Sequence, residues 1–354
     1  MEKAASGQYH QRDGLSNSSQ ALIPLSQLYN PPSPHKIHPG ANQVIEQVQQ
    51  WLYPHLEQLG AEKLIKGIID ETASACAYLY PNADDEGIFL VTGFLTVQFI
   101  NDDMFDSATI RKAIRATPSG QCLARDVQKL RDTPQRLADG ICCETMSDLE
   151  TDLFLLGAVY ELSTHFGKSH ALIYTEPKDM TFEEYADYRV RNSGLIYSVL
   201  FVEMVTGNFL SDEQKAIPQI SQMQQHCERL GSLLNEIFSY EKETFLKSAN
   251  NPVAVLMREE GIGLYEAARR VAAMAQRHAE EITRIKVEID IEYGDGNDKD
   301  AGLRSYVGDM ELFGAANWFW QLEGTKRYSS KTSPFVELRL VNGDSEIEAE
   351  EGAR

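Results

Sequence analysis

The sequence predicts an all-α protein that folds as one domain. Apolar residues recur at helical spacing along most of the chain, and strand-like alternation is limited to the short stretches 287–293 and 335–341. Hydrophobic residues make up 42% of the 354 residues, a share that is typical of folded rather than disordered proteins. The length permits one large domain or two, and no repeat of fixed period divides the chain. We therefore expect a single helical bundle.

Composition argues against several classes of protein. The 53 acidic residues outnumber the 33 Lys and Arg residues, and the net charge of −20 would repel a nucleic-acid backbone. Five cysteines, an odd number without C-x-x-C spacing, disfavour a disulfide framework and a cysteine-based zinc site. The longest apolar run, residues 88–100, is shorter than the ~20 residues that span a bilayer, and the polar residues 1–20 lack the core of a signal peptide. We expect a cytoplasmic protein with no nucleic-acid partner and no membrane insertion.

The ends of the chain differ in composition from its middle. Residues 1–26 are rich in Ser, Gln and Gly, and the last residues are acidic, so we expect disordered tails at 1–26 and 329–354 around a domain at 27–328. Prolines within 31–39 predict an extended segment at the entry to this domain. The apolar period then predicts helices near 44–56, 64–79, 85–105, 146–167, 181–206, 218–246, 252–257, 263–286 and 302–323.

The first group of candidate functional residues is a set of aspartates at the end of the most apolar predicted helix. Asp102 and Asp106 are four residues apart, so both carboxylates project from one face, with Asp103 beside them. The C-terminal end of a helix carries a partial negative charge that repels acidic side chains. A functional role for these aspartates is therefore favoured over a helix end that is merely exposed to water. Mg²⁺ prefers carboxylate oxygens, so we interpret the three aspartates as a metal site.

A second candidate site lies on the helix predicted at 218–246. Asn235, Ser239 and Glu243 follow an i, i+4, i+8 pattern, and each step drifts only about 40° around a helix. An amide, a hydroxyl and a carboxylate on one stripe suit a Mg²⁺ ion that keeps several waters. A solvated polar face is the alternative. Lys242 adds a positive charge beside this metal stripe, which we define as Asn235, Ser239 and Glu243.

Basic residues stand out because the protein is acidic. Arg189 lies in the segment 181–194, and Lys326, Arg327 and Tyr328 follow the aromatic stretch 318–320. The guanidinium group presents a planar fork that matches phosphate oxygens. A single arginine is most often a surface residue, but their combination with two metal-type sites points to an anionic ligand.

These motifs, in this order, resemble those of the microbial class I terpene synthase family. The segment from Asp102 to Asp106 resembles the family's aspartate-rich motif. Asn235, Ser239, Lys242 and Glu243 resemble its second metal motif, with Glu236 where the family often has aspartate. Arg189 lies 46 positions before Asn235, where the family places its diphosphate sensor, and Arg327-Tyr328 resembles the family's C-terminal Arg-Tyr pair. The stretch that begins at Asn251 is similar to a further family segment.

One position departs from the family pattern. The family usually has a glycine four residues after the sensor, which acts through its backbone carbonyl. Here Ser193 holds that position, Gly194 follows, and Asn192 is the linker. The effector residue is therefore either Ser193 or Gly194.

The resemblance implies a helical bundle with a central active-site cavity and a Mg²⁺-dependent reaction. A prenyl diphosphate would be ionised with three Mg²⁺ ions, for which Mn²⁺ is the substitute, and its carbocation would then cyclise. Arg189, Lys242, Arg327 and Tyr328 would bind the diphosphate, and Phe99 and Trp318 match cavity-lining positions. For each of these aromatic residues, simple core packing is the alternative.

The substrate and the reaction class leave alternatives. Farnesyl diphosphate, converted to a cyclic sesquiterpene, is favoured, and a diterpene synthase acting on geranylgeranyl diphosphate comes next. A chain-elongating prenyltransferase is less favoured because the chain has the metal stripe where that class has a second aspartate-rich motif. A catalytically silent helical binding protein is disfavoured because the motifs are complete. A homodimer is common among proteins of the resembled family.

Overall fold

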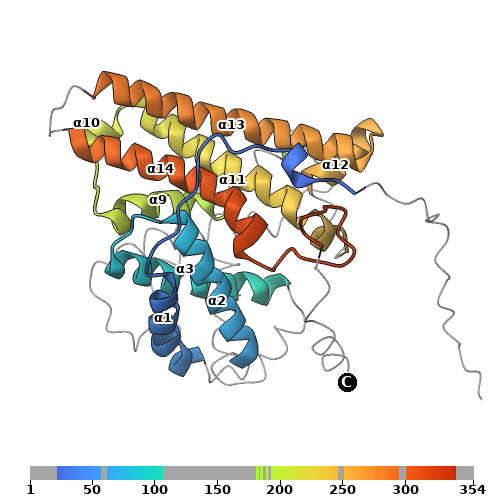
Figure 1. Ribbon diagram of the computed structural model, residues 1–354, viewed down its shortest axis with the longest axis horizontal. Coiled ribbons are helices and arrows are strands. Elements are labelled where there is room, and N and C mark those ends of the chain that lie inside the picture. The colour runs from blue at the N-terminus through green and yellow to red at the C-terminus, as the bar shows by residue number, and fades with distance from the viewer. Residues whose placement is uncertain are drawn as a thin grey trace, which may run out of the picture.

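The computed structural model describes residues 22–56, 62–106, 181–182, 184–185, 189, 193–245, 251–294 and 300–339. Within these ranges the chain is built of helices, which confirms the all-α prediction (Figure 1). The pairing of Ile23 with Phe335 is an isolated parallel bridge. The helix expected near 146–167 lies outside the described ranges. In the part of the chain that is described, no helix is both long and apolar enough to cross a membrane.

Three helices at the start of the chain form one group. These are α1 (Ala41–Leu56), α2 (Glu62–Leu79) and α3 (Asp85–Asp106). Asp84 caps α3, because its Oδ1 accepts a hydrogen bond of 2.6 Å from the Gly87 amide. α2 packs against both α1 and α3, and α3 carries the aspartate motif on its last turns.

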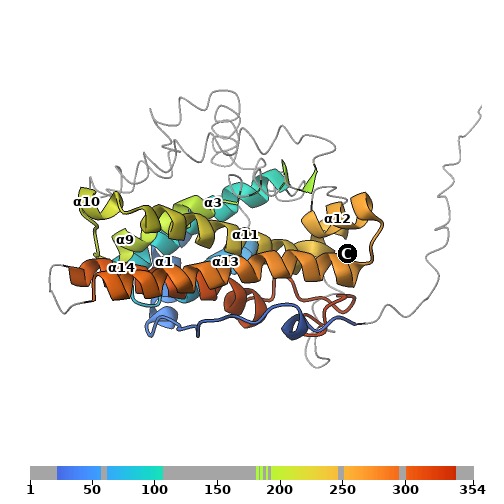
Figure 2. The ribbon, with the colours of Figure 1, turned by 90° about the horizontal axis from the view of Figure 1, so that it is seen from above.

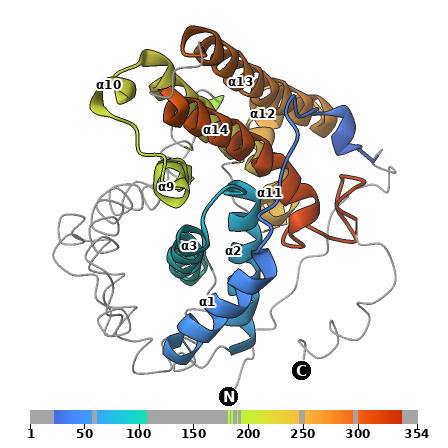
Figure 3. The same cartoon turned by 60° about the vertical axis from the view of Figure 1, so that its left-hand side comes forward.

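The remaining described helices form a second group, which Figure 3 shows alongside the first. They are α9 (Leu195–Thr206), α10 (Asp212–Lys215), α11 (Pro218–Phe245), α12 (Pro252–Glu260), α13 (Leu264–Glu292) and α14 (Ala301–Phe319). α11 and α13 lie side by side over much of their length (Figures 1 and 2), and α14 packs against both. α9 and α14 join the two groups, because α9 packs against α3 and α14 packs against α2.

Two local expectations need correction. The strand-like alternation at 287–293 belongs to α13 as far as Glu292, where Ile285 and Ile289 are fully buried at helical spacing. The last predicted helix changes form before its end: α14 is followed by a π-helical turn, Trp320–Gly324, just ahead of Arg327. π-Helical turns are frequent at functional sites.

The expected tails, 1–26 and 329–354, also include residues that pack against the rest of the domain. Residues 22–26 and 329–339 are ordered and lie against each other, since the Ile23 amide donates to the Pro334 carbonyl at 2.9 Å and the Val336 amide donates to the Ile23 carbonyl at 3.0 Å. Leu25 and Phe335 are fully buried. The polar average composition of both ends concealed these few apolar residues, whose burial extends the domain beyond 27–328.

Candidate active site

Asn235 contacts two other residues singled out in the sequence, Arg189 and Tyr328. Its side chain projects from α11 toward two different segments. The Oδ1 atom accepts a hydrogen bond of 3.0 Å from Arg189 Nη2. The Nδ2 group donates to the Tyr328 hydroxyl at 2.8 Å and to Gln321 Oε1 at 3.1 Å. The second metal motif, the sensor arginine and the Arg-Tyr pair therefore meet at one amide.

Ser239 lies one helical turn further along α11 and carries a buried polar atom without a partner. The residue is 4% exposed, and its Oγ makes no hydrogen bond with the described residues. An unsatisfied buried hydroxyl costs about 1–3 kcal/mol, so such an atom calls for an explanation. An oxygen donor left open beside an amide and a carboxylate fits a hard cation such as Mg²⁺.

Glu243, the last residue of the metal stripe, is held by Asn251. Asn251 Nδ2 donates to Glu243 Oε2 at 3.0 Å and to the Glu236 carbonyl at 2.7 Å. The same side chain caps α12, because Asn251 Oδ1 accepts from the Val253 amide at 2.9 Å. Asn251 is fully buried. Sequence reasoning noted Asn251 only as part of a similar stretch and did not foresee this support of Glu243.

Arg189 is fixed by a buried carboxylate that sequence reasoning did not assign. Arg189 Nε forms an ion pair with Glu236 Oε1, and the Tyr185 hydroxyl donates to Glu236 Oε2 at 3.1 Å. Glu236 is 1% exposed. Burial raises the pKa of Glu236 to about 7, while Arg189 favours the carboxylate and so opposes the rise. No periodic pattern in a sequence relates residues 47 positions apart, so only the fold reveals this pair.

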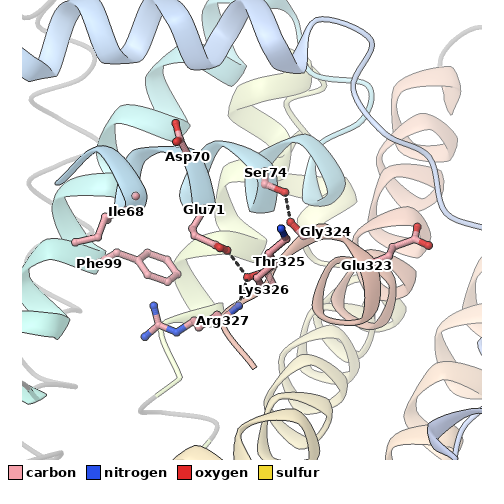
Figure 4. Close-up of a pocket in the computed structure, with 11 residues that line it drawn as sticks. Ile68, Asp70, Glu71, Ser74, Phe99, Glu323, Gly324, Thr325, Lys326 and Arg327 are labelled. Carbon is pink, nitrogen blue, oxygen red and sulfur yellow. Dashed lines mark hydrogen bonds between the residues drawn. The ribbon is translucent and has the colours of Figure 1, made fainter. Parts of the chain in front are cut away.

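Arg327 has a different setting. Its guanidinium lies over the Phe99 ring, with Cζ 5.7 Å from the ring centroid, which is a cation–π geometry. Both residues line a pocket of about 560 Å³ between α2 and the segment that follows α14, and Figure 4 shows Arg327 extending beneath Phe99. The aromatic residue three positions before the aspartate motif thus contacts the Arg-Tyr pair.

The break before α9 falls at Gly194. Gly194 has φ of 71°, a left-handed conformation that favours glycine, and it precedes the first residue of α9. Ser193 Oγ accepts a hydrogen bond of 3.3 Å from the Leu195 amide. Gly194 therefore has the glycine conformation directly before α9, and the choice between Ser193 and Gly194 as effector stays a prediction. Asn192 lies outside the described residues.

Two other residues of the predicted site differ in exposure: Trp318 is buried and Lys242 is exposed. Trp318 is 3% exposed and packs against Tyr29 and Phe238, with ring centroids 4.8 and 5.2 Å away. These contacts match core packing, and a place on the cavity stays a prediction. Lys242 is exposed near the end of α11.

The aspartate motif is placed by its backbone alone. α3 runs through Asp106, so Asp102, Asp103 and Asp106 lie on its final turns, and their side chains are outside the description. Among the side chains that are described, no group of three or more His, Cys, Asp or Glu residues is arranged to hold a metal ion. The metal stripe offers one carboxylate, one amide and one hydroxyl instead.

Comparisons with known proteins relate this chain to terpene synthases. A family model described as "Terpene synthase family 2, C-terminal metal binding" matches residues 171–281, a range that contains Arg189, the metal stripe and Asn251. Macrophomene synthase of Macrophomina phaseolina is 31% identical over 35% of this chain, and that match spans 18% of the relative's own length.

Two further relatives match over most of their length. The (+)-aristolochene synthase of Penicillium expansum is 25% identical over 83% of this chain and 88% of its own. The 7-epi-α-eudesmol synthase of Streptomyces viridochromogenes, named as "(2E,6E)-farnesyl diphosphate cyclizing", is 23% identical over 77% of this chain and 83% of its own.

A solved structure shows the same fold. The crystal structure of germacradien-4-ol synthase from Streptomyces citricolor superimposes with a TM-score of 0.65 over 84% of this chain and 99% of that chain, at 19% identity. The family model and the relatives that match over most of their length, together with the contacts around Asn235, support a class I terpene synthase.

Proposed function

We propose that this terpene cyclase is Mg²⁺-dependent, ionises farnesyl diphosphate and guides the resulting carbocation to a cyclic sesquiterpene with release of diphosphate. The observation that carries the proposal is the meeting of Arg189, Asn235 and Tyr328 beside the buried hydroxyl of Ser239, which has no hydrogen-bond partner among the described residues. The farnesyl chain is favoured because a relative that matches 77% of this chain is named for cyclising that substrate.

Two sets of residues would hold the three Mg²⁺ ions. Asn235, Ser239 and Glu243 supply one set on α11, and Asp102, Asp103 and Asp106 supply the other at the end of α3. The Asn235 carbonyl oxygen has two lone pairs, so it can accept from Arg189 and still bind an ion. Bound Mg²⁺ would stabilise the negative charge that develops on the departing diphosphate.

Basic and hydroxyl groups of the chain would bind the diphosphate itself. Arg189 keeps Nε on Glu236 and has other N–H groups that suit phosphate oxygens. The segment after α14 would contribute Arg327 and Tyr328, and the end of α11 would contribute Lys242. Together these groups would exclude water from the leaving group. The backbone carbonyl of Ser193 or Gly194, linked through Asn192, would act as the effector.

The hydrocarbon part of the substrate needs a pocket without nucleophiles. An allylic cation is stabilised by aromatic faces, and Phe99 already holds the Arg327 guanidinium in a cation–π contact. We assign Phe99 and Trp318 to the cavity wall on this basis. A diterpene synthase acting on geranylgeranyl diphosphate is the second candidate.

The test is to incubate the purified enzyme with the C10, C15 and C20 prenyl diphosphates, with and without Mg²⁺, and to analyse the hydrocarbon extract. We expect a cyclic C15 product that requires Mg²⁺. Turnover of the C20 substrate alone would replace the proposal with a diterpene synthase, and a lengthened prenyl diphosphate would replace it with a prenyltransferase.

A second readout does not depend on turnover. Mg²⁺ together with inorganic diphosphate should raise the melting temperature far more than either does alone. The reason is that the carboxylates and the diphosphate are both negatively charged, so they bind next to each other only when Mg²⁺ ions lie between them. An equal shift from Mg²⁺ alone would contradict the ordered assembly of metal and diphosphate.

A further inference from the structure

The segment that carries the Arg-Tyr pair, residues 324–328, is docked on one face of α2. The α2 residues Glu71, Ser74 and Tyr78 follow an i, i+3, i+7 spacing, which places them on one side of the helix. Figure 4 shows Glu71 and Ser74 directed at Thr325 and Gly324. We propose that Glu71, acting through the Thr325 hydroxyl, is a positioning residue for Arg327. This inference rests on the proposed function, in which Arg327 binds diphosphate.

Thr325 makes two hydrogen bonds that use its hydroxyl in both directions. Its Oγ1 donates to Glu71 Oε2 and accepts from the Arg327 backbone amide at 3.0 Å. An ionised carboxylate only accepts hydrogen bonds, and a hydroxyl has a single proton. Glu71 therefore directs that proton toward α2 and turns a lone pair of Thr325 toward the Arg327 amide.

Neighbouring contacts keep the turn on α2. The Ser74 hydroxyl donates to the Gly324 carbonyl at 2.6 Å. A Cβ on Gly324 would lie 2.7 Å from Trp320 Cδ1 and 2.8 Å from Tyr78 Cε2, so only glycine allows this close approach. The π-helical turn Trp320–Gly324 delivers the chain to this point. Thr325 itself is 8% exposed, so its hydrogen bonds are protected from water.

The docking decides where the Arg327 guanidinium lies. Arg327 leaves the turn two residues after Thr325, and its guanidinium sits over Phe99 on α3. Glu71, Phe99 and Arg327 line the same pocket of about 560 Å³. If Thr325 loses its hydrogen bond to Glu71, the Arg327 backbone gains freedom, and the guanidinium no longer starts from a fixed position when diphosphate arrives.

The test compares two substitutions of one residue. Thr325→Val removes the hydroxyl at nearly constant shape, whereas Thr325→Ser keeps it. We expect Thr325→Val to weaken binding of Mg²⁺ with inorganic diphosphate about tenfold by calorimetry, and to raise KM for the prenyl diphosphate by a similar factor, as the loss of one to two buried hydrogen bonds predicts. Thr325→Ser should stay within about twofold of the wild type on both measures.

A second pair tests the carboxylate independently. Glu71→Ala removes the acceptor, and Glu71→Gln restores an oxygen that can accept from Thr325, so the alanine variant should repeat the defect and the glutamine variant should largely rescue it. Glu311→Ala is the matched control, because Glu311 on α14 also accepts a hydrogen bond from a hydroxyl, that of Ser33 at 2.7 Å, and does not line this pocket. It should bind diphosphate as the wild type does.

The outcomes separate the two proposals. Wild-type diphosphate affinity in Thr325→Val and Glu71→Ala, with only a lower melting temperature, would show that the contact is merely structural and would overturn the positioning role. In that case the wild-type enzyme would still bind diphosphate and turn over substrate, so the proposed function would stand. A wild-type protein that binds no diphosphate in the presence of Mg²⁺ would overturn both.

Discussion

The two arginines proposed to bind diphosphate are held in opposite ways. Arg189 is fixed through its side chain, by a buried ion pair with Glu236 and a hydrogen bond to Asn235. Arg327 is fixed through its backbone, by Thr325 and Glu71, while its guanidinium lies over Phe99 at the wall of a pocket. An ion pair therefore holds the Arg189 side chain, whereas backbone hydrogen bonding in a turn holds Arg327.

The difference has an energetic consequence. Removing one partner of a buried ion pair leaves an uncompensated charge and costs about 3–5 kcal/mol in stability. Moving the Arg189 side chain away from the buried Glu236 would therefore be strongly unfavourable. A cation–π contact contributes about 0.5–2 kcal/mol, so the Arg327 guanidinium can move to a ligand at low cost. The Arg189 side therefore provides a preset donor, and the Arg327 side provides one that can close over the substrate.

Asn235 belongs to both sides, so its removal should have the largest effect. Asn235→Ala deletes a proposed metal ligand, the acceptor of Arg189 and the donor to Tyr328 together. We expect turnover to fall by about 10³-fold or more with the fold retained, as checked by product analysis and circular dichroism. Gln225→Ala, at an exposed position of the same helix, is the control. Full activity in Asn235→Ala would remove the basis for the site.

Glu236→Gln breaks the Arg189 side alone. The variant keeps the shape and loses the charge, so the half-buried Arg189 loses its counter-ion, and we expect a loss of about 2–4 kcal/mol in the free energy of unfolding. Denaturant titration measures it, and kcat/KM should fall at the same time because Arg189 is no longer oriented. Glu281→Gln is the matched control: Glu281 pairs with Arg284 at an exposed site, where about 0–1 kcal/mol is expected. Equal losses in the two variants would contradict the contrast between the arginines.

Tyr328→Phe breaks the link from Asn235 to the Arg327 side and removes a hydroxyl proposed to bind diphosphate. The Asn235 Nδ2 group keeps its bond to Gln321, so one hydrogen bond is lost, worth about 0.5–1.5 kcal/mol. We expect a stability change of that size, measured by thermal unfolding, and a drop in kcat/KM. Tyr306→Phe makes the same chemical change at a buried tyrosine that accepts from Gln224, away from the site. It should reduce stability similarly and leave kcat/KM unchanged, and a matching drop in activity would mean that Tyr328 acts through stability alone.

Sequence reasoning succeeded where the determinants are local. The helical period identified α11 and placed Asn235, Ser239 and Glu243 on one stripe, because that relation needs only a few turns of one helix. It failed where partners are distant in the chain. The Arg189–Glu236 pair and the Glu71–Thr325 bond join residues 47 and 254 positions apart, and no local pattern reports such contacts. The packing of Leu25 and Phe335 escaped notice for the same reason.

The smallest expected effect on the site comes from the other face of α11. His226 is nine residues before Asn235, about half a turn around the helix, and its Nδ1 lies 2.8 Å from Nδ1 of His278 on α13. Burial lowers the pKa of His278 to about 4, with His226, Arg229 and Arg277 adding to the fall and Glu281 opposing it. An unfolded chain takes up this proton near pH 6.5 and the folded chain only near pH 4, so stability should fall as the pH drops through that interval.

His278→Gln should flatten this dependence by about 1–2 kcal/mol, after allowance for partial exposure, and should leave kcat/KM at pH 7.5 unchanged. Denaturant titrations at pH 7 and pH 5 measure the first effect. A loss of activity as large as that of Tyr328→Phe would show instead that the α11–α13 contact, and not the two arginines alone, sets the geometry of the site.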